Sequence, residues 1–242
     1  MDANTDDRCV LPLPFVEETR FGNWFIGTRT WQVHVLRRAL NDLERLTGAP
    51  RRSYGAILDV GFGWGYSLME LAGRFKPQRL VGIDPDPVSH AHLIANDVVA
   101  RCAVRPEIRF ANAEDLSLLP DESFDLLFCH QTFHHIIRQE VAIAEFFRVL
   151  KPGGALMFAE STRQYIHSWL IRYLFRHPME AQKTAGEYIA LIRDAGFDAP
   201  AQRISLPYLW WSRNDLGLFE KLGFKPPAIR EETLVNLVAT KP

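Results

Sequence analysis

The sequence predicts an α/β protein in which a doubly wound sheet carries helices on both faces. Residues 57–60 form an apolar run that is followed by a turn with alternating glycines and then by apolar residues at helical spacing. A second apolar run, 79–83, ends in an acid, and short apolar runs continue to alternate with helical patterns. Such alternation is typical of a largely parallel sheet built from strand–helix–strand units.

The glycine turn separates two classes of nucleotide cofactor. A dinucleotide fingerprint requires Gly-x-Gly-x-x-Gly, so that a pyrophosphate can approach the N-terminus of a helix. Here Gly61, Gly63 and Gly65 alternate, and Tyr66 occupies the place that the fingerprint gives to glycine. The turn contains no Lys or Arg. These features favour a ligand without phosphates that presents an amino acid and a nucleoside, and they argue against the alternative, a dehydrogenase.

The second predicted strand ends at Asp84, 19 residues after Gly65. A carboxylate at this place accepts hydrogen bonds from both ribose hydroxyls of a nucleoside. The alternative is an ordinary turn, because Asp followed by Pro, as at Asp84 and Pro85, favours turns in many proteins. The glycine turn before it favours the ribose role.

Three further segments complete the pattern. Residues 108–116 include Asn-Ala, residues 120–129 join Ser-Phe-Asp to an apolar strand, and residues 148–158 include Lys-Pro-Gly-Gly. In this order the segments resemble the motifs of the class I S-adenosylmethionine-dependent methyltransferases. The resemblance implies S-adenosylmethionine as the cofactor. It also implies a Rossmann-like, seven-stranded mixed sheet whose last strand, 232–240, is antiparallel.

The resemblance also assigns residues to the cofactor. It places the ribose on Asp84 and the adenine beside Asn112 and Ala113. The family usually has Asp where this chain has Asn112, but an amide oxygen still accepts a hydrogen bond from the adenine amine. The predicted cofactor residues are Asp59, Gly61, Phe62, Gly63, Gly65, Asp84, Pro85, Asn112, Ala113, Glu114 and His130.

The chemistry is expected at the carboxyl ends of strands four and five, near His130 and His134. The Asn-Pro-Pro-Tyr motif of adenine, cytosine-amine and glutamine N-methyltransferases is missing there. Phe-His-His at 133–135 instead resembles the Leu-His-His of ubiquinone and menaquinone methyltransferases. Because a His can deprotonate a phenol or thiol near neutral pH, His130 and His134 are the candidate catalytic residues. Two alternatives stay open, a structural His pair that caps the next helix and a reaction driven by proximity alone.

Residues 1–50 are expected to form an N-terminal helical extension, and residues 51–242 the methyltransferase domain with a helical insertion at about 162–200. Apolar spacing from Trp31 to Leu43 predicts a helix that ends at Thr47-Gly-Ala-Pro50. The extension also contains an aromatic cluster around one arginine: Phe21, Trp24, Phe25, Arg29 and Trp31. This cluster either lines the methyl-transfer pocket, with the arginine as a candidate for the methionine carboxylate, or packs against the sheet.

In the insertion, the spacing predicts one helix over 165–176 and another over 184–195, which ends at Gly196. A sixth strand is expected at about 204–209. The first helix has a predicted apolar face made of Ile166, Trp169, Leu170, Tyr173 and Leu174. That face either covers an apolar substrate, lies on a membrane surface, or packs against the core or a second subunit.

Composition limits the function. The formal net charge is −1 and no block of Lys and Arg occurs, so a nucleic-acid partner is not expected. The three cysteines show neither a disulfide nor a metal-binding spacing, and no metal is predicted. The absence of an 18-residue apolar run predicts no transmembrane segment, and the acidic start predicts no secretory signal.

We therefore expect a cytoplasmic methyltransferase that acts on a small, largely apolar or aromatic molecule. The alternative is a non-catalytic S-adenosylmethionine-binding protein that acts through a protein partner. The sequence leaves the oligomeric state open.

Overall fold

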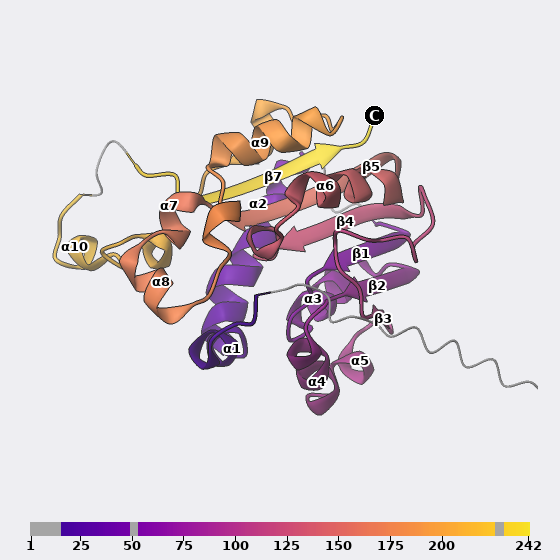
Figure 1. Ribbon diagram of the computed structural model, residues 1–242, viewed down its shortest axis with the longest axis horizontal. Helices are drawn as coiled ribbons and strands as arrows, with labels where there is room; N and C mark the ends of the chain where they lie inside the picture. The colour runs from indigo at the N-terminus through magenta and orange to yellow at the C-terminus, as the bar shows by residue number, and fades with distance from the viewer. Residues whose placement is uncertain (1–15, 49–52, 226–229) are drawn as a thin grey trace, which may run out of the picture.

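The computed structural model describes residues 16–48, 53–225 and 230–242, and contains one seven-stranded sheet in the order β3-β2-β1-β4-β5-β7-β6 (Figure 1). Strands β1 to β5 pair in parallel, and β7 runs antiparallel to both of its neighbours. This confirms the predicted mixed sheet with an antiparallel last strand. The strands are β1 Ala56–Val60, β2 Arg79–Ile83, β3 Glu107–Arg109, β4 Phe124–His130, β5 Leu150–Ser161, β6 Ile204–Ser205 and β7 Leu234–Thr240.

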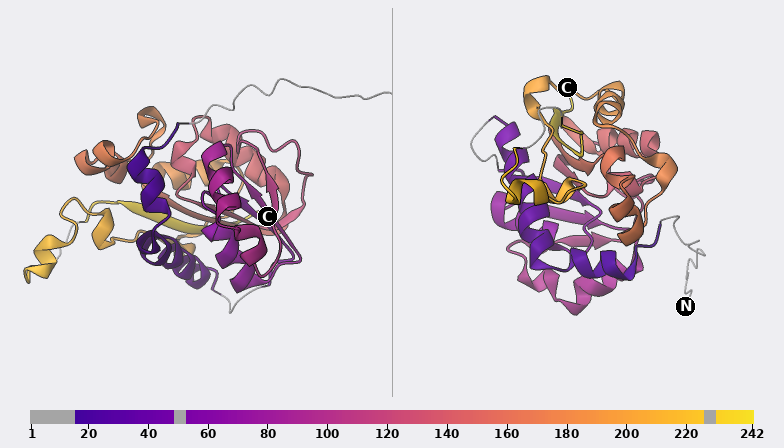
Figure 2. Two further views of the ribbon diagram at one scale, coloured as in Figure 1. Left: turned by 90° about the horizontal axis from the view of Figure 1, so that it is seen from below. Right: turned by 90° about the vertical axis from the view of Figure 1, so that its left-hand side faces the viewer.

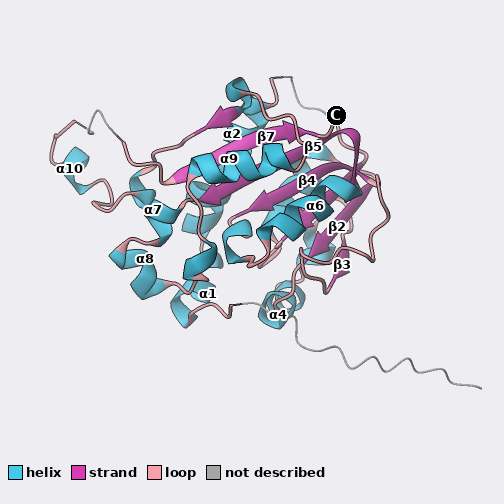
Figure 3. Cartoon of the chain, turned by 45° about the horizontal axis from the view of Figure 1, so that its top comes forward, coloured by secondary structure: helices cyan, strands magenta, loops and turns pink. Residues whose placement is uncertain are grey.

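Helices cover both faces of the sheet, and each covered face has its own hydrophobic core. Because successive strand residues point to opposite faces, Leu58 packs in the cluster under α6 and α9, and Ile57 packs in the cluster under α2 and α3. Figure 3 shows α6 and α9 lying across one face. The described helices are α1 Arg20–Ile26, α2 Arg37–Leu46, α3 Tyr66–Phe75, α4 Pro87–Ala95, α5 Val98–Arg101, α6 Gln139–Val149, α7 Arg163–Ile166, α8 Trp169–Leu174, α9 Ala185–Asp194 and α10 Leu218–Lys221.

The predicted helix from Trp31 is present, and it begins with a π-helical turn, Trp31–Leu36, that continues directly into α2. The shorter helix α1 precedes it, and α1 lies beside the insertion (Figure 2). The Thr19 hydroxyl donates to the carbonyl of Leu174 (2.6 Å), and the ring of Phe175 contacts those of Phe21 and Phe25 edge-on. The N-terminal segment and the insertion therefore pack against each other at one end of the sheet.

The prediction of one helix over 165–176 was wrong. Ser168 has an extended backbone (φ −61°, ψ 144°), so the segment divides into α7 and α8. The break also changes which side chains are buried. Ile166 and Ile171 point inward, whereas Trp169 and Tyr173 are 73% and 82% exposed. The apolar face inferred from a continuous helical spacing is therefore not the buried face.

The second predicted helix of the insertion is α9. Thr184 and Glu187 form a capping box at its start, and Gly196 follows its end with φ +101°. The sixth strand is shorter than the predicted 204–209 and ends at Ser205. Pro207 explains the early end, because proline has no N–H to donate to a strand ladder. No helix among the described residues is long and apolar enough to cross a membrane.

Candidate active site

The glycine turn joins β1 to α3 in a conformation that requires glycine. Gly61, Gly63 and Gly65 all have positive φ angles, of 75°, 53° and 82°. A Cβ atom on Gly61 would lie 2.2 Å from the Thr132 side chain, and one on Gly65 would lie 2.7 Å from Val98. The turn therefore keeps its backbone close to the end of β4, where no larger residue would fit.

Asp84 follows β2 and connects to the glycine turn. The N–H of Gly63 donates to its Oδ2 (2.9 Å) and the N–H of Asp86 donates to its Oδ1 (2.9 Å). Burial raises the pKa of Asp84 to about 7. Each carboxylate oxygen retains a second lone pair, so Asp84 can still accept hydrogen bonds from two hydroxyl groups.

A cavity opens beside the glycine turn and extends to the roof formed by the N-terminal segment. It encloses about 900 Å³ of empty space, which includes the solvent at its mouth. We call it the main cavity. Its lining consists of Val16, Glu18, Asn23, Ile26, Trp31, Gly61, Phe62, Gly63, Trp64, Ser67, Asp84, Pro85, Asp86, Ser89, Phe128, His130, Gln131, Thr132 and His135.

Six of the predicted cofactor residues line the main cavity. They come from the glycine turn and from the ends of β2 and β4: Gly61, Phe62, Gly63, Asp84, Pro85 and His130. Gly65 lies behind the turn as the cap of α3. Asp59 is also buried behind the turn, where its Oδ2 accepts from the Ser67 hydroxyl (2.5 Å) and burial raises its pKa to about 7.

The predicted adenine segment does not line the main cavity. The Asn112 amide oxygen accepts from the N–H of Glu114 (3.1 Å), and Ala113 packs in the core under α6. The Glu114 carboxylate accepts from the backbone N–H and the Nε of Arg138 (3.0 and 2.7 Å). Contact between the cofactor and these three residues therefore stays a prediction.

The far end of the main cavity is apolar and surrounds His130. The indole ring of Trp31 meets the His130 ring edge-on at 5.6 Å between centroids, and Phe128 stacks on it at 5.8 Å. His130 Nε2 is buried without a hydrogen-bond partner among the described residues. Burial lowers the pKa of His130 to about 4, so its imidazole is neutral near pH 7.

The structure separates His134 from His130. His134 Nδ1 donates to Oε2 of Glu160 at the end of β5 (2.6 Å), and both side chains are buried. Glu160 Oε1 also accepts from the N–H groups of Thr132 and Phe133 (2.8 and 2.7 Å). Glu160 was not predicted from the sequence, although an acid at the end of an otherwise apolar buried strand is a usable signal.

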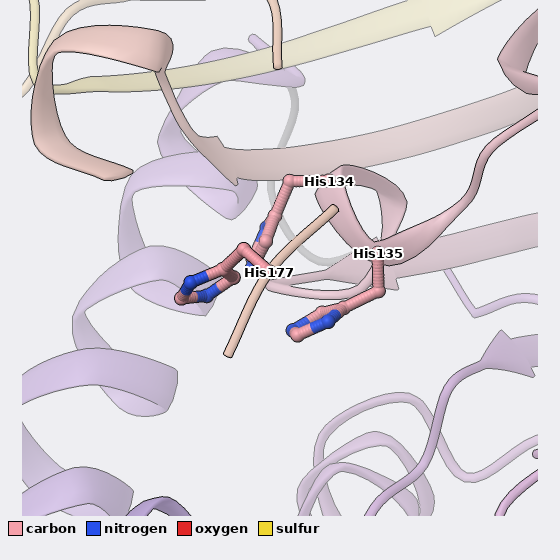
Figure 4. Close-up of side chains that lie close together, drawn as sticks. All are labelled: His134, His135 and His177. Carbon is pink, nitrogen blue, oxygen red and sulfur yellow. The ribbon is translucent and has the colours of Figure 1, made fainter. Parts of the chain in front are cut away.

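His134 lines an adjacent hollow, which we call the histidine pocket (Figure 4). His135 lines both hollows, so they adjoin there. The histidine pocket is lined by Glu18, Phe25, Ile26, Trp31, Val35, Gln131, His134, His135, Ser161, Tyr165, Ile166, Ile171, Phe175, His177 and Trp211.

The aromatic cluster of the N-terminal segment divides between pocket and surface. Trp31 lines both hollows and Phe25 lines the histidine pocket. Phe21 and Trp24 are exposed. Arg29 is exposed and lines neither hollow, so the structure does not support it as a partner of the methionine carboxylate.

Comparison with known proteins agrees with the fold and the glycine turn. Residues 58–158 match the family described as "Methyltransferase domain". A "probable S-adenosylmethionine-dependent methyltransferase" of Mycolicibacterium smegmatis is 32% identical over 59% of this chain and 51% of its own length. A demethylmenaquinone methyltransferase of Deinococcus radiodurans is 35% identical over 48% of this chain and 46% of its own length.

A tRNA (guanine-N(7)-)-methyltransferase of Brucella abortus is 29% identical over 57% of this chain and 62% of its own length. The chain thus spans about half the length of the Mycolicibacterium and Deinococcus relatives and 62% of the Brucella relative. Among solved structures, an S-adenosylmethionine-dependent methyltransferase of Aquifex aeolicus superposes with a TM-score of 0.63 at 15% identity. That superposition covers 91% of this chain and 97% of the other.

Proposed function

We propose that this chain, which carries a class I S-adenosylmethionine-dependent methyltransferase domain, transfers the methyl group to a small, largely apolar or aromatic acceptor. The observation that carries the proposal is the main cavity. It joins the glycine turn and Asp84 at one end to Trp31, Phe128 and His130 at the other. One hollow therefore offers polar groups for a nucleoside and an apolar space for an acceptor.

At the polar end, Asp84 accepts hydrogen bonds from the ribose hydroxyls, and the glycine turn leaves space for the amino-acid part of the cofactor. At the apolar end, aromatic rings would hold the sulfonium, because the faces of such rings attract a cation. Trp31 and Phe128 supply such rings in the main cavity. This arrangement directs the methyl group toward His130 and the acceptor.

Methyl transfer is a displacement at carbon. The acceptor atom would form a bond to the methyl carbon as the carbon–sulfur bond breaks, the sulfur would retain the electron pair as a neutral thioether, and the proton of the acceptor hydroxyl or thiol would pass to water at the cavity mouth. Because positive charge leaves the sulfur, an apolar cavity that excludes water favours the reaction together with close positioning. Neutral His130 is suited to hold an acceptor hydroxyl by a hydrogen bond. Its lowered pKa makes it a weak general base.

Charge and motifs support a small-molecule acceptor. The formal net charge of −1 and the absence of a basic block do not suit nucleic acid, although a tRNA methyltransferase is among the relatives. The relative that acts on demethylmenaquinone, by its name, has an apolar aromatic substrate. The aromatic lining around His130 matches an acceptor of that kind.

The test is a methyl-transfer assay with isotopically labelled S-adenosylmethionine and a panel of phenols, quinols, thiols, transfer RNA and protein. We expect label in a phenol, quinol or thiol and none in RNA or protein. Trp31→Ala should raise the acceptor KM while the Kd of S-adenosylhomocysteine, which carries no sulfonium charge and is measured by calorimetry, changes less than about twofold. Label transferred to RNA or protein would contradict the proposed acceptor class.

The second candidate is a cofactor-binding protein without turnover. Its mark would be tight binding of S-adenosylmethionine with no transfer to any member of the panel and retention of a protein partner that depends on the cofactor. The complete glycine turn and the open apolar end of the main cavity favour catalysis.

A further inference from the structure

Three histidines from two distant segments meet in the histidine pocket. His134 and His135 lie in the 3-10 turn after β4, and His177 follows α8. One nitrogen from each ring lies within 4.8 Å of the other two, and the ring centroids are 4.4–5.0 Å apart (Figure 4). Three imidazole nitrogens therefore converge on one point.

The converging nitrogens are available to a ligand. His134 Nδ1 donates to Glu160, so in the neutral ring the lone pair of Nε2 is left for a ligand. No hydrogen bond joins the rings of His135 or His177 to another described residue. The neutral imidazole is the form that binds metal ions.

Glu160 supplies an independent reason for a cation at this point. Its side chain is fully buried, and among the described residues no Lys or Arg lies within salt-bridge distance of it. A buried carboxylate needs a positive partner. A cation bound to His134 Nε2 would balance Glu160 through the ring. Metal-binding histidines commonly donate their second nitrogen to a carboxylate in this way.

We propose that His134, His135 and His177 bind one divalent transition-metal ion of the zinc type, and that Glu160 orients His134. Imidazole ligands favour zinc, copper, nickel or iron over magnesium and calcium. On a tetrahedral ion with bonds of 2.0–2.1 Å, the nitrogens would be about 3.3 Å apart. The nitrogens now lie within 4.8 Å of one another, so they would have to approach by up to about 1.5 Å to complete such a site.

Three protein ligands leave one coordination position open. Glu18 lines the histidine pocket, but its carboxylate accepts from the N–H groups of Thr19 and Arg176 and is not among the clustered ligand atoms. His135 lines the main cavity as well, which places the ion at the border of the proposed acceptor space. The metal proposal depends only on the ligand side chains and does not rest on methyl transfer.

The test uses the full, tag-free chain after chelator treatment. Zn²⁺ is titrated by calorimetry, and Co²⁺ is added separately, because its visible absorption distinguishes four-coordinate from six-coordinate sites. We expect one Zn²⁺ per chain and a four-coordinate Co²⁺ spectrum. Glu160→Gln should weaken Zn²⁺ binding about 10- to 100-fold, and His135→Gln and His177→Gln should weaken it more.

His167→Gln is the matched control, because His167 is an exposed histidine of the same insertion and lies outside the cluster. It should bind Zn²⁺ like the unmodified chain. Zn²⁺ should also raise the Tm of the unmodified chain and of His167→Gln, but not that of His177→Gln. Absent binding, or equal binding in the unmodified chain and in folded His177→Gln, would overturn the proposal.

Discussion

The two halves of the sheet's carboxyl edge are built in different ways. At the ends of β1 and β2, backbone groups dominate, because glycines at positive φ open the turn and Asp84 holds it by accepting an N–H. At the ends of β4 and β5, side chains dominate, because buried Glu160 organises His134 and the following turn. Under the proposed function, the first half would bind the nucleoside, whereas the second would supply the specific chemistry and an apolar lining.

This difference suggests that the two halves have different roles. The half at the ends of β1 and β2, which we call the backbone half, depends on a few positions at which no side chain fits. Cofactor binding should therefore be sensitive to substitutions of these glycines and of Asp84. The half at the ends of β4 and β5, which we call the side-chain half, depends on the buried charge of Glu160. Substitutions there should affect stability, metal binding and acceptor selection. The predictions below test this division, from the largest expected effect to the smallest.

Glu160→Ala should have the largest effect. It removes a buried acceptor from two backbone N–H groups and from His134, and three buried donors left without a partner together cost about 3–5 kcal/mol. The free energy of unfolding, measured with denaturant, should fall by about that amount. Glu17→Ala, at an exposed glutamate, should change it by less than about 0.5 kcal/mol. Similar losses in both variants would show that Glu160 does not organise this half.

Gly61→Ala should damage the backbone half. The new methyl group would lie 2.2 Å from Thr132 at a φ of +75°. Overpacking and backbone strain together should cost about 2–4 kcal/mol of stability and should weaken S-adenosylmethionine binding. Gly73→Ala is the matched control, because its Cβ meets nothing within 4 Å in the helix α3. It should stabilise the protein by about 0.5–1 kcal/mol.

Asp84→Asn should weaken S-adenosylmethionine binding at least about tenfold, because each lost charge-assisted hydrogen bond is worth about 1.5–3 kcal/mol. Calorimetry measures this Kd. Asp125→Asn, at the opposite end of the sheet in an ion pair with Lys151, is the control and should leave the Kd unchanged. An unaltered Kd in folded Asp84→Asn would contradict the assignment of Asp84 to the ribose.

The pH dependence of cofactor binding also tests the ribose assignment of Asp84. Burial raises the pKa of Asp84 from 3.8 to about 7 in the free protein, so its carboxyl group stabilises the fold below about pH 4 and loses that contribution as pH rises through 7. The ionised form is the better acceptor of ribose hydroxyls. Cofactor affinity should therefore rise as pH increases through about 7, and Asp84→Asn should flatten this dependence. Asp59, whose pKa is also about 7, titrates in both proteins.

His130→Gln should have the smallest effect. With the acceptor that the labelling assay identifies, kcat/KM should fall about tenfold, which corresponds to one hydrogen bond of about 1–1.5 kcal/mol. The cofactor Kd should stay unchanged. A loss of 10²-fold or more would instead indicate general-base catalysis by His130.

The backbone half could be predicted because its signals are contiguous. The glycines, Asp84 and the strands before them lie within one strand–helix–strand unit, so spacing alone identified them. Of the side-chain half, His130 and His134 were predicted, and Glu160 carried a signal at the end of its strand. The contact of Glu160 with His134 depends on the pairing of β5 with β4, and that of His177 depends on how the insertion packs, so neither contact could be predicted. The continuous spacing over 165–176 also gave no sign of the break at Ser168. Likewise, no metal was expected because cysteine spacing cannot reveal a histidine cluster from separate segments.

The most direct test of the central claim, that one cavity binds both cofactor and acceptor, is a crystal structure with S-adenosylhomocysteine. We predict that both ribose hydroxyls lie within hydrogen-bonding distance of Asp84 and that the thioether sulfur faces Trp31 and His130. A nucleoside bound outside the main cavity, or a sulfur directed away from the apolar end, would contradict this account.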